Sequence, residues 1–177
     1  MHTIGSVLNE LRTAPGELLV RRWNWKSALY SSVCRSALFF AVNLGAGMRE
    51  AAGAMSAEFV YRAATAGFYG ALTQAFRKVE PRWHGAVVAT GMLIVVSHTI
   101  ELAIHWLRGT PNLWGSIGAS LAFTAASTLF NLHAMRQGAL VTGAEGKTMA
   151  ADLRMLPSIV ASIFTRPAHS RPLRSEL

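Results

Sequence analysis

The segment GTPNLWGSIGASLAFTAASTLFNLHAM, residues 109–135, contains no Asp, Glu, Lys or Arg. A helix of about 20 apolar residues is long enough to cross the hydrocarbon core of a bilayer. A helix on the surface of a globular protein normally has a charged face, and this segment has none. Three further charge-free stretches occur, at 36–48, 63–76 and 83–100. The sequence therefore predicts an integral membrane protein.

The composition of the whole chain supports this interpretation. Of its 177 residues, 51% are hydrophobic and 15% are charged, whereas an average globular domain has about 25% charged residues. The formal net charge is +8, but Lys and Arg gather at the flanks of the apolar stretches. Because there is no continuous basic run, we expect no nucleic-acid partner. The single cysteine, Cys34, excludes an intrachain disulfide.

The fold class expected from these patterns is an all-α integral membrane protein with a four-transmembrane-helix bundle. The bundle would occupy residues 27–136, with spans at about 27–47, 51–76, 83–107 and 113–136. Indole side chains prefer the headgroup level of a bilayer, so tryptophans are expected at span ends. Every tryptophan lies near such an end: Trp23, Trp25, Trp83, Trp106 and Trp114.

Short amphipathic cytoplasmic helices are expected on both sides of the spans. Within the segment 1–26, apolar residues at helical spacing predict a helix over 3–13. Within the segment 137–177, a glycine-rich linker precedes an amphipathic stretch over 149–164. We expect Pro157 to interrupt that stretch. The second helix would lie on the inner leaflet or pack on the bundle or on the N-terminal helix.

The distribution of basic residues predicts the orientation of the spans. Lys and Arg concentrate in the N-terminal flank, the 77–82 loop and the C-terminal segment, which places both termini in the cytoplasm. The prediction is thus a multi-pass protein of the bacterial inner membrane, with the run from residue 27 as a retained anchor rather than a signal peptide. The alternative is a soluble, Ala-rich four-helix bundle, against which the charge-free fourth span argues.

Polar side chains within the second and third predicted spans form the candidate site. Glu58 and Arg62 are spaced i, i+4, so they share one helix face. His98, Glu101 and His105 are spaced i, i+3, i+7 and share a face of the next helix. Counted at 1.5 Å per residue, both glutamates would lie about 10 Å below the outer ends of their spans. Unpaired charges are costly at that depth, so we expect the five side chains to form one intramembrane polar cluster.

Three interpretations of this cluster remain open. It can be structural, holding two helices in register, or it can be a proton, ion or substrate site. The third is a metal site with His98, Glu101 and His105 as Zn or Fe ligands, although the spacing matches neither H-E-x-x-H nor a di-metal carboxylate bundle. Two carboxylates and one arginine need one further positive charge or proton. Arg35 is expected to extend towards the headgroups instead, and Asn43 is a further candidate member.

The sequence contains little that points to catalysis. The segment GAEGKT at 143–148 is not a phosphate loop, because Val141 stands where the first glycine is required. We expect no cofactor, no resident metal and no enzymatic activity. The favoured function is an accessory or assembly component that binds lipid and associates with other membrane subunits or with copies of itself through faces of small residues. The alternatives are a small transporter or channel and, less favoured, an intramembrane metal-dependent enzyme.

Overall fold

The computed structural model describes residues 3–107 and 113–165, with side chains for 3–99 and 121–165. Within these ranges the regular structure is helical. In chain order the elements are α1 (Ile4–Thr13), the π-helical turn η1 (Glu17–Arg21), α2 (Trp25–Asn43), the 3-10 turn η2 (Leu44–Ala46), α3 (Met48–Phe76), α4 (Arg82–Leu107), α5 (Leu113–Arg136) and α6 (Met149–Phe164).

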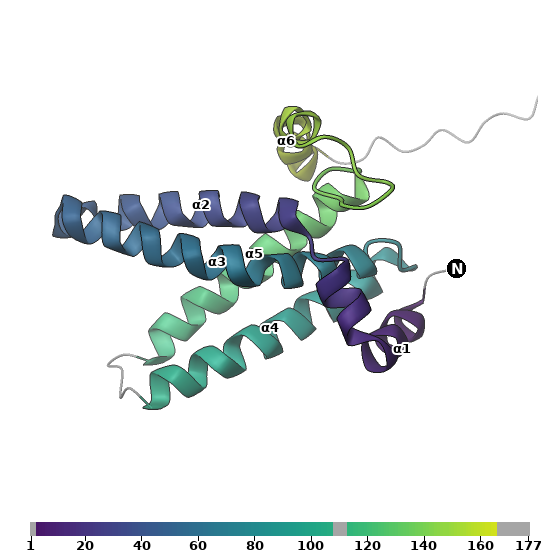
Figure 1. Ribbon diagram of the computed structural model, residues 1–177, viewed down its shortest axis with the longest axis horizontal. Helices are drawn as coiled ribbons and strands as arrows, with labels where there is room; N and C mark the ends of the chain where they lie inside the picture. The colour runs from purple at the N-terminus through teal and green to yellow at the C-terminus, as the bar shows by residue number, and fades with distance from the viewer. Residues whose placement is uncertain (1–2, 108–112, 166–177) are drawn as a thin grey trace, which may run out of the picture.

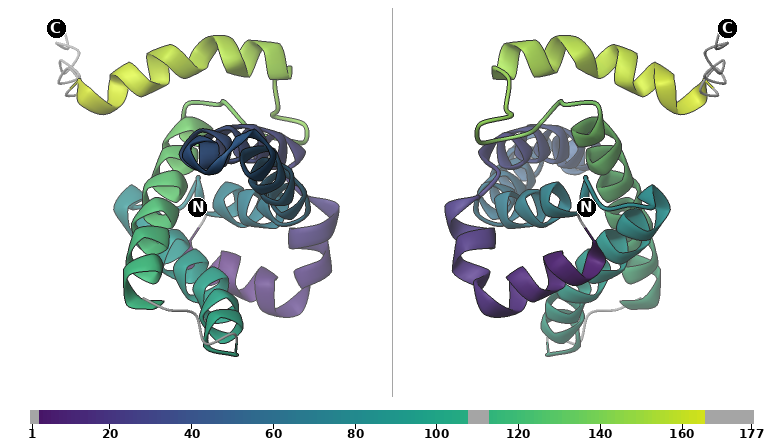
Figure 2. Two further views of the ribbon diagram at one scale, coloured as in Figure 1. Left: turned by 90° about the vertical axis from the view of Figure 1, so that its left-hand side faces the viewer. Right: turned by 90° about the vertical axis from the view of Figure 1, so that its right-hand side faces the viewer.

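Two long helical hairpins diverge from a common region, as Figure 1 shows. We call them the α2–α3 arm and the α4–α5 arm. The region where α1, η1, the end of α3, the start of α4, the end of α5 and α6 meet is called the base. Figure 2 shows α6 and α1 on opposite sides of the base. Because the arms diverge, the helices do not form the expected four-helix bundle.

Two apolar clusters hold the base together. The first buries Val7 of α1 against Phe76 of α3 and Leu93 of α4. The second joins the end of α5 to the linker 137–148 and to Ile159 of α6. Since burial of apolar surface is the main favourable term in folding, these clusters fix the positions of α1 and α6 on the two sides of the base.

Glycines let the start of α2 approach α3 closely. A Cβ atom on Gly67 would lie 2.0 Å from Cε2 of Trp23, and one on Gly70 would lie 2.5 Å from the Cβ of Ser27. The amide of Asn24 also donates to the carbonyl of Gly67 at 3.0 Å. The small residues of α3 therefore pack against a segment of the same chain, and Trp23 is a packing residue rather than a residue at a span end.

None of the helices, as far as their residues are described, is long and apolar enough to cross a membrane. The predicted transmembrane bundle and the multi-pass inner-membrane location with cytoplasmic termini are therefore wrong. The prediction treated absence of charge as evidence of apolarity. However, residues such as Gly, Ala, Ser and Thr, which are frequent in the segments taken as spans, bury little apolar surface and gain little from hydrocarbon.

The C-terminal amphipathic helix differs from the expected one in two ways. α6 runs through Pro157 without a break, so the interruption predicted there is wrong. The side chains that α6 buries completely are Asp152 and Ile159, whereas Leu153 and Val160 of the predicted apolar stripe are 48% and 44% exposed. Thr148 is the N-cap of α6: its hydroxyl oxygen accepts a hydrogen bond from the amide of Ala151. This satisfies one of the free N–H groups of the first turn.

Candidate functional site

The predicted polar cluster is centred on Glu58 in the middle of the α2–α3 arm. Its Oε1 accepts one hydrogen bond from Nε of Arg62 at 2.8 Å and one from Nε of Arg35 at 2.7 Å. All three side chains are between 11% and 17% exposed. Arg35 thus pairs with Glu58 instead of extending away along α2. Arg35 thereby supplies the further positive charge that we expected beside two carboxylates and one arginine.

The α4–α5 arm contacts this group through neighbouring residues of α5. The guanidinium carbon of Arg35 lies 4.2 Å from the ring centroid of Phe123, a cation–π distance. Thr124, the next residue along α5, has its hydroxyl 3.2 Å from Nε2 of the buried His98. Phe123 and Thr124 therefore link Arg35 on one arm to His98 on the other.

The rest of the predicted cluster is described only in part. The side chains of Glu101 and His105 lie outside the described part of the chain, so the interpretation as a metal site stays a prediction. Among the described side chains, no group of three or more His, Cys, Asp or Glu residues is placed to hold a metal ion. Asn43 donates to the carbonyl of Phe39 in its own helix. The described contacts join α2 to α3 and to α5, and α4 to α5. The structural interpretation placed them between the second and third predicted spans, so it stays a prediction.

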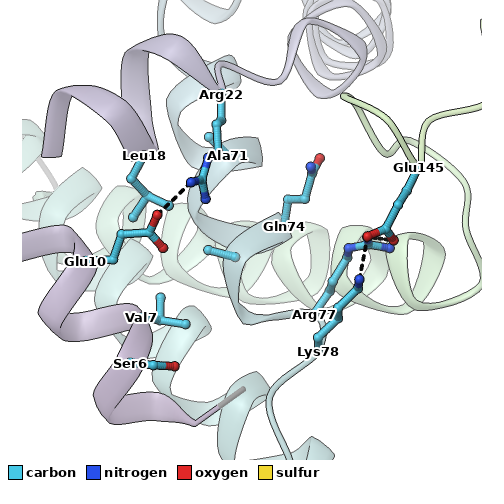
Figure 3. A pocket seen from close by; sticks show the side chains of 11 residues that line it. Ser6, Val7, Glu10, Leu18, Arg22, Ala71, Gln74, Arg77, Lys78 and Glu145 are labelled. Atoms are coloured by element: carbon cyan, nitrogen blue, oxygen red, sulfur yellow. Dashed lines mark hydrogen bonds and ion pairs between the residues drawn. The ribbon is translucent and has the colours of Figure 1, made fainter. Parts of the chain in front are cut away.

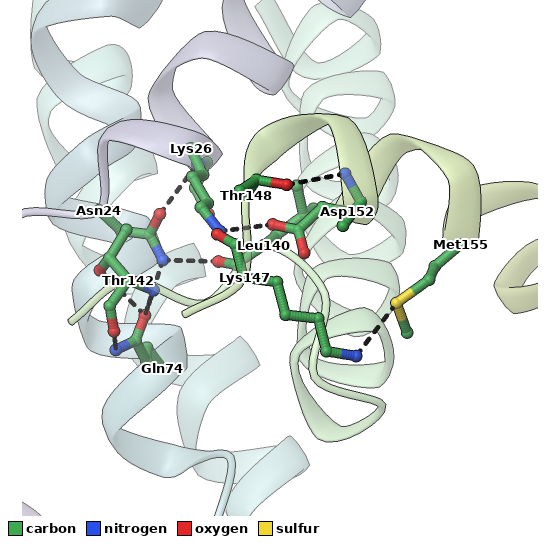
Figure 4. Close-up of polar contacts among 11 residues, drawn as sticks. Asn24, Lys26, Gln74, Leu140, Thr142, Lys147, Thr148, Asp152 and Met155 are labelled. Carbon is green, nitrogen blue, oxygen red and sulfur yellow. Dashed lines mark hydrogen bonds and ion pairs between the residues drawn. The ribbon is translucent and has the colours of Figure 1, made fainter. Parts of the chain in front are cut away.

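A second polar network lies at the base, where the linker 137–148 meets both helices of the α2–α3 arm (Figure 4). Asn24 is completely buried, and its Nδ2 donates to Oε1 of Gln74 and to the carbonyl of Leu140, each at 2.9 Å. Gln74 in turn donates to the carbonyl of Thr142 and accepts from its amide. With every polar atom of Asn24 and Gln74 bonded, the network costs little to bury and fixes the linker on α3.

A buried ion pair lies beside this network, also visible in Figure 4. Nζ of Lys26 donates to Oδ2 of Asp152 at 2.6 Å and to the carbonyl of Lys147 at 2.5 Å. The two side chains are 3% and 0% exposed. Asp152 occupies the first turn of α6, where the helix dipole also favours a negative charge. The pair connects the first turn of α2 to the first turn of α6.

A cavity of about 440 Å³ opens on the other side of Gln74, between α1, η1 and the end of α3 (Figure 3). Its apolar walls include Val7, Leu18 and Ala71. Charged side chains surround the rest of it: Glu10, Arg22, Arg77, Lys78 and Glu145. Pockets of 300–1,000 Å³ with apolar walls and a few polar groups are typical of small-molecule sites.

The charges around the cavity are arranged as two ion-paired groups. Arg22 pairs with Glu10 at 2.8 Å. Arg77 and Lys78 both bind the carboxylate of Glu145, each at 2.5 Å. Three cations therefore face two carboxylates, which leaves one positive charge in excess.

Glu145 titrates below the ordinary glutamate value because two cations hold its charged form. Hydrogen bonds from Lys78, then from Arg77, lower its pKa from 4.5. Because the pKa of Glu145 is lowered in the folded protein, its ion pairs with Lys78 and Arg77 are fully formed above pH 4.5. They are lost as the pH falls through the lowered pKa.

We therefore expect the Glu145 side-chain carboxyl carbon to titrate below pH 4.5 in an NMR titration. Lys78→Gln should move the midpoint upward, because the largest cause of the shift is removed. Lys147→Gln is the control, since the amine of Lys147 contacts Met155 and this variant should leave the Glu145 midpoint unchanged. A midpoint that Lys78→Gln does not move would contradict the pairing.

One face of α2 is left uncovered between the base and the end of the arm. Near the base, Tyr30 stacks on Phe130 of α5 with the ring centroids 6.0 Å apart. Burial, followed by the adjacent Cys34 thiol, raises the pKa of Tyr30 to about 12, so the hydroxyl is protonated at neutral pH. Beyond Tyr30 a set of exposed residues follows, which we call the α2 outer face: Val33, Cys34, Ala37, Leu38 and Ala41.

The residues of the base network were not among the predicted site residues. Asn24 precedes an apolar run, which is the position of a helix N-cap, and this signal was available. For Gln74, Lys26 and Asp152 no local pattern exists, because their partners are remote in the chain. The comparisons with known proteins add no further guidance: no protein-family model matches the chain, and no curated protein or solved structure does so.

Proposed function

We propose that this protein is a non-enzymatic assembly component that associates with a second copy of itself through the α2 outer face. The observation that carries the proposal is that this face is apolar, exposed and free of charge. Contiguous exposed apolar surface on a folded protein usually marks an interaction site. Val33 and Leu38, the largest side chains of the face, are 52% and 45% exposed.

The absence of charge makes this face suitable for a second copy. A chain with a formal net charge of +8 repels its copies through most of its surface. The two cations of α2, Lys26 and Arg35, are both paired with carboxylates of the same chain. Two α2 outer faces can therefore meet without bringing like charges together.

The shape of the face also suits a helix-to-helix contact. Ala37 and Ala41 lie one turn apart and let a partner helix approach closely.

We expect the purified chain to form a dimer, and Leu38→Arg to raise its dissociation constant at least thirtyfold. The substitution would place a charge from each copy in the middle of an apolar contact, where desolvation and repulsion are both unfavourable. Light scattering after size-exclusion chromatography across a dilution series measures this. Val95→Arg is the matched control, because Val95 is 64% exposed on the other arm and should leave the dimer unchanged.

The single cysteine provides a second test. If two α2 outer faces pair in parallel, the exposed Cys34 residues of the two copies lie at the same level of the contact. Mild oxidation should then give a covalent dimer in wild type and much less of it in Leu38→Arg. A chain that stays monomeric at high concentration, or one whose cross-linking is the same in both variants, would overturn the proposal.

A further inference from the structure

The cavity at the base holds a positively charged position that a carboxylate of the same chain occupies. Arg77 and Lys78 converge on Glu145 from the end of α3 (Figure 3). Arginine and lysine arranged in this way are the usual protein partners of carboxylate and phosphate groups. The position is therefore chemically suited to an external anion as well as to Glu145.

We propose that this cavity binds a small organic anion, a carboxylate or phosphate on an apolar body, whose charged group replaces Glu145 on Arg77 and Lys78. The assignment concerns the base and does not depend on the proposed self-association through α2. The proposed self-association does not use this cavity.

Arg77 is held in place more firmly than the carboxylate that it binds. Arg77 is 12% exposed, and its Nη1 also donates to the carbonyl of Met135 at 3.4 Å. Glu145 is 57% exposed and lies in a turn closed by the hydrogen bond from Gly146 to Gly143. Gly143 has φ +83°, a conformation that glycine adopts without strain. Glu145 can thus leave the cations while the helix end that presents them stays fixed.

The linker stays attached when Glu145 leaves, because other contacts hold it. Thr142 remains bonded to Gln74, and Leu140 remains completely buried with its carbonyl bonded to Asn24. Exchange of the carboxylate therefore requires only a local movement of the turn around Glu145. Such a movement costs far less than release of the whole linker.

The apolar walls define the rest of the ligand. Val7 of α1, Leu18 of η1 and Ala71 and Ala75 of α3 line the cavity beside the charged position. A bare inorganic ion would leave these walls without a partner. An alkyl or aromatic body attached to the anion would remove them from water, which is favourable in proportion to the apolar area buried.

Isothermal titration calorimetry with hexyl phosphate, hexanoate and inorganic phosphate tests the proposal on the full chain. In Glu145→Gln the internal competitor is removed, so hexyl phosphate or hexanoate should bind at least tenfold more tightly than to wild type. Inorganic phosphate should bind at least tenfold more weakly than hexyl phosphate. Glu50→Gln, an exposed glutamate at the opposite end of α3, is the matched control and should behave as wild type.

A double variant shows whether the gain comes from the proposed cations. Lys78→Gln combined with Glu145→Gln should lose the increase in affinity, while circular dichroism confirms that the helices are retained. Equal binding to wild type and Glu145→Gln, or a gain that persists in the double variant, would overturn the assignment. So would inorganic phosphate that binds as tightly as hexyl phosphate, because the apolar walls would then contribute nothing.

Discussion

Lys26→Met will lower the free energy of unfolding by about 3–5 kcal/mol, because it leaves the carboxylate of Asp152 buried and unpaired. Methionine preserves most of the side-chain volume, so the loss reports the charge rather than a cavity. Asp152 is 0% exposed, and within the described residues its second oxygen, Oδ1, has no hydrogen-bond partner. Water therefore cannot replace the missing ammonium group without opening the contact between α2 and α6.

Chemical denaturation followed by far-UV circular dichroism measures this loss. Arg21→Met is the control, since Arg21 pairs with Glu17 at the surface with 77% and 39% exposure, and it should cost less than about 1 kcal/mol. Replacing both members, Lys26→Met with Asp152→Leu, should recover most of the stability, because no buried charge remains. A Lys26→Met loss as small as that of Arg21→Met would mean that the pair is hydrated in solution.

Gly67→Ala will destabilise the fold by about 3 kcal/mol, the upper end of the usual cost of overpacking. The new methyl group would lie 2.0 Å from Cε2 of Trp23 and 2.1 Å from its Nε1. The indole is a rigid ring, so it must move as a unit and take the neighbouring Asn24 with it. The hydrogen bond from the amide of Asn24 to the carbonyl of Gly67 would then lengthen or break.

Gly53→Ala in the same helix is the matched control for this prediction. A Cβ atom on Gly53 would meet nothing within 4 Å. Since alanine is the better helix former, this substitution should stabilise the fold by up to about 1 kcal/mol. The same denaturation measurement gives both values, and two substitutions of the same sign and size would contradict the close packing of Trp23 on α3.

The helices were predictable from local patterns, whereas their environment was not. The spacing of apolar residues reflects the backbone directly, and the helix over 4–13 corresponds to the one expected at 3–13. The environment of a helix depends on its whole surface. The middle of the α2–α3 arm contains an Arg–Glu–Arg group, and α5 contains hydroxyl residues such as Thr124 and Thr128. A charge count alone does not distinguish such helices from membrane spans.

In the candidate site, too, contacts within one helix were predictable and contacts between helices were not. The contact between Glu58 and Arg62 follows from their spacing within one helix. Arg35 belongs to another helix, and its contact with Glu58 depends on how that helix is rotated against α3. The cavity at the base depends on more distant relations still, since it brings together α1, the end of α3 and Glu145. The spacing of residues along the sequence does not show which distant segments will meet.

The long-range contacts at the base have a consequence for the order of folding. Each arm joins helices that are neighbours in the chain, so each can form early with little loss of loop entropy. The bonds from Asn24 to Leu140 and from Lys26 to Asp152 close loops of 116 and 126 residues. We expect them to form after both hairpins and to be the first to open under mild denaturant. The amides of α6 should then exchange with deuterated solvent ahead of those in the buried part of α3, as a separate cooperative unit.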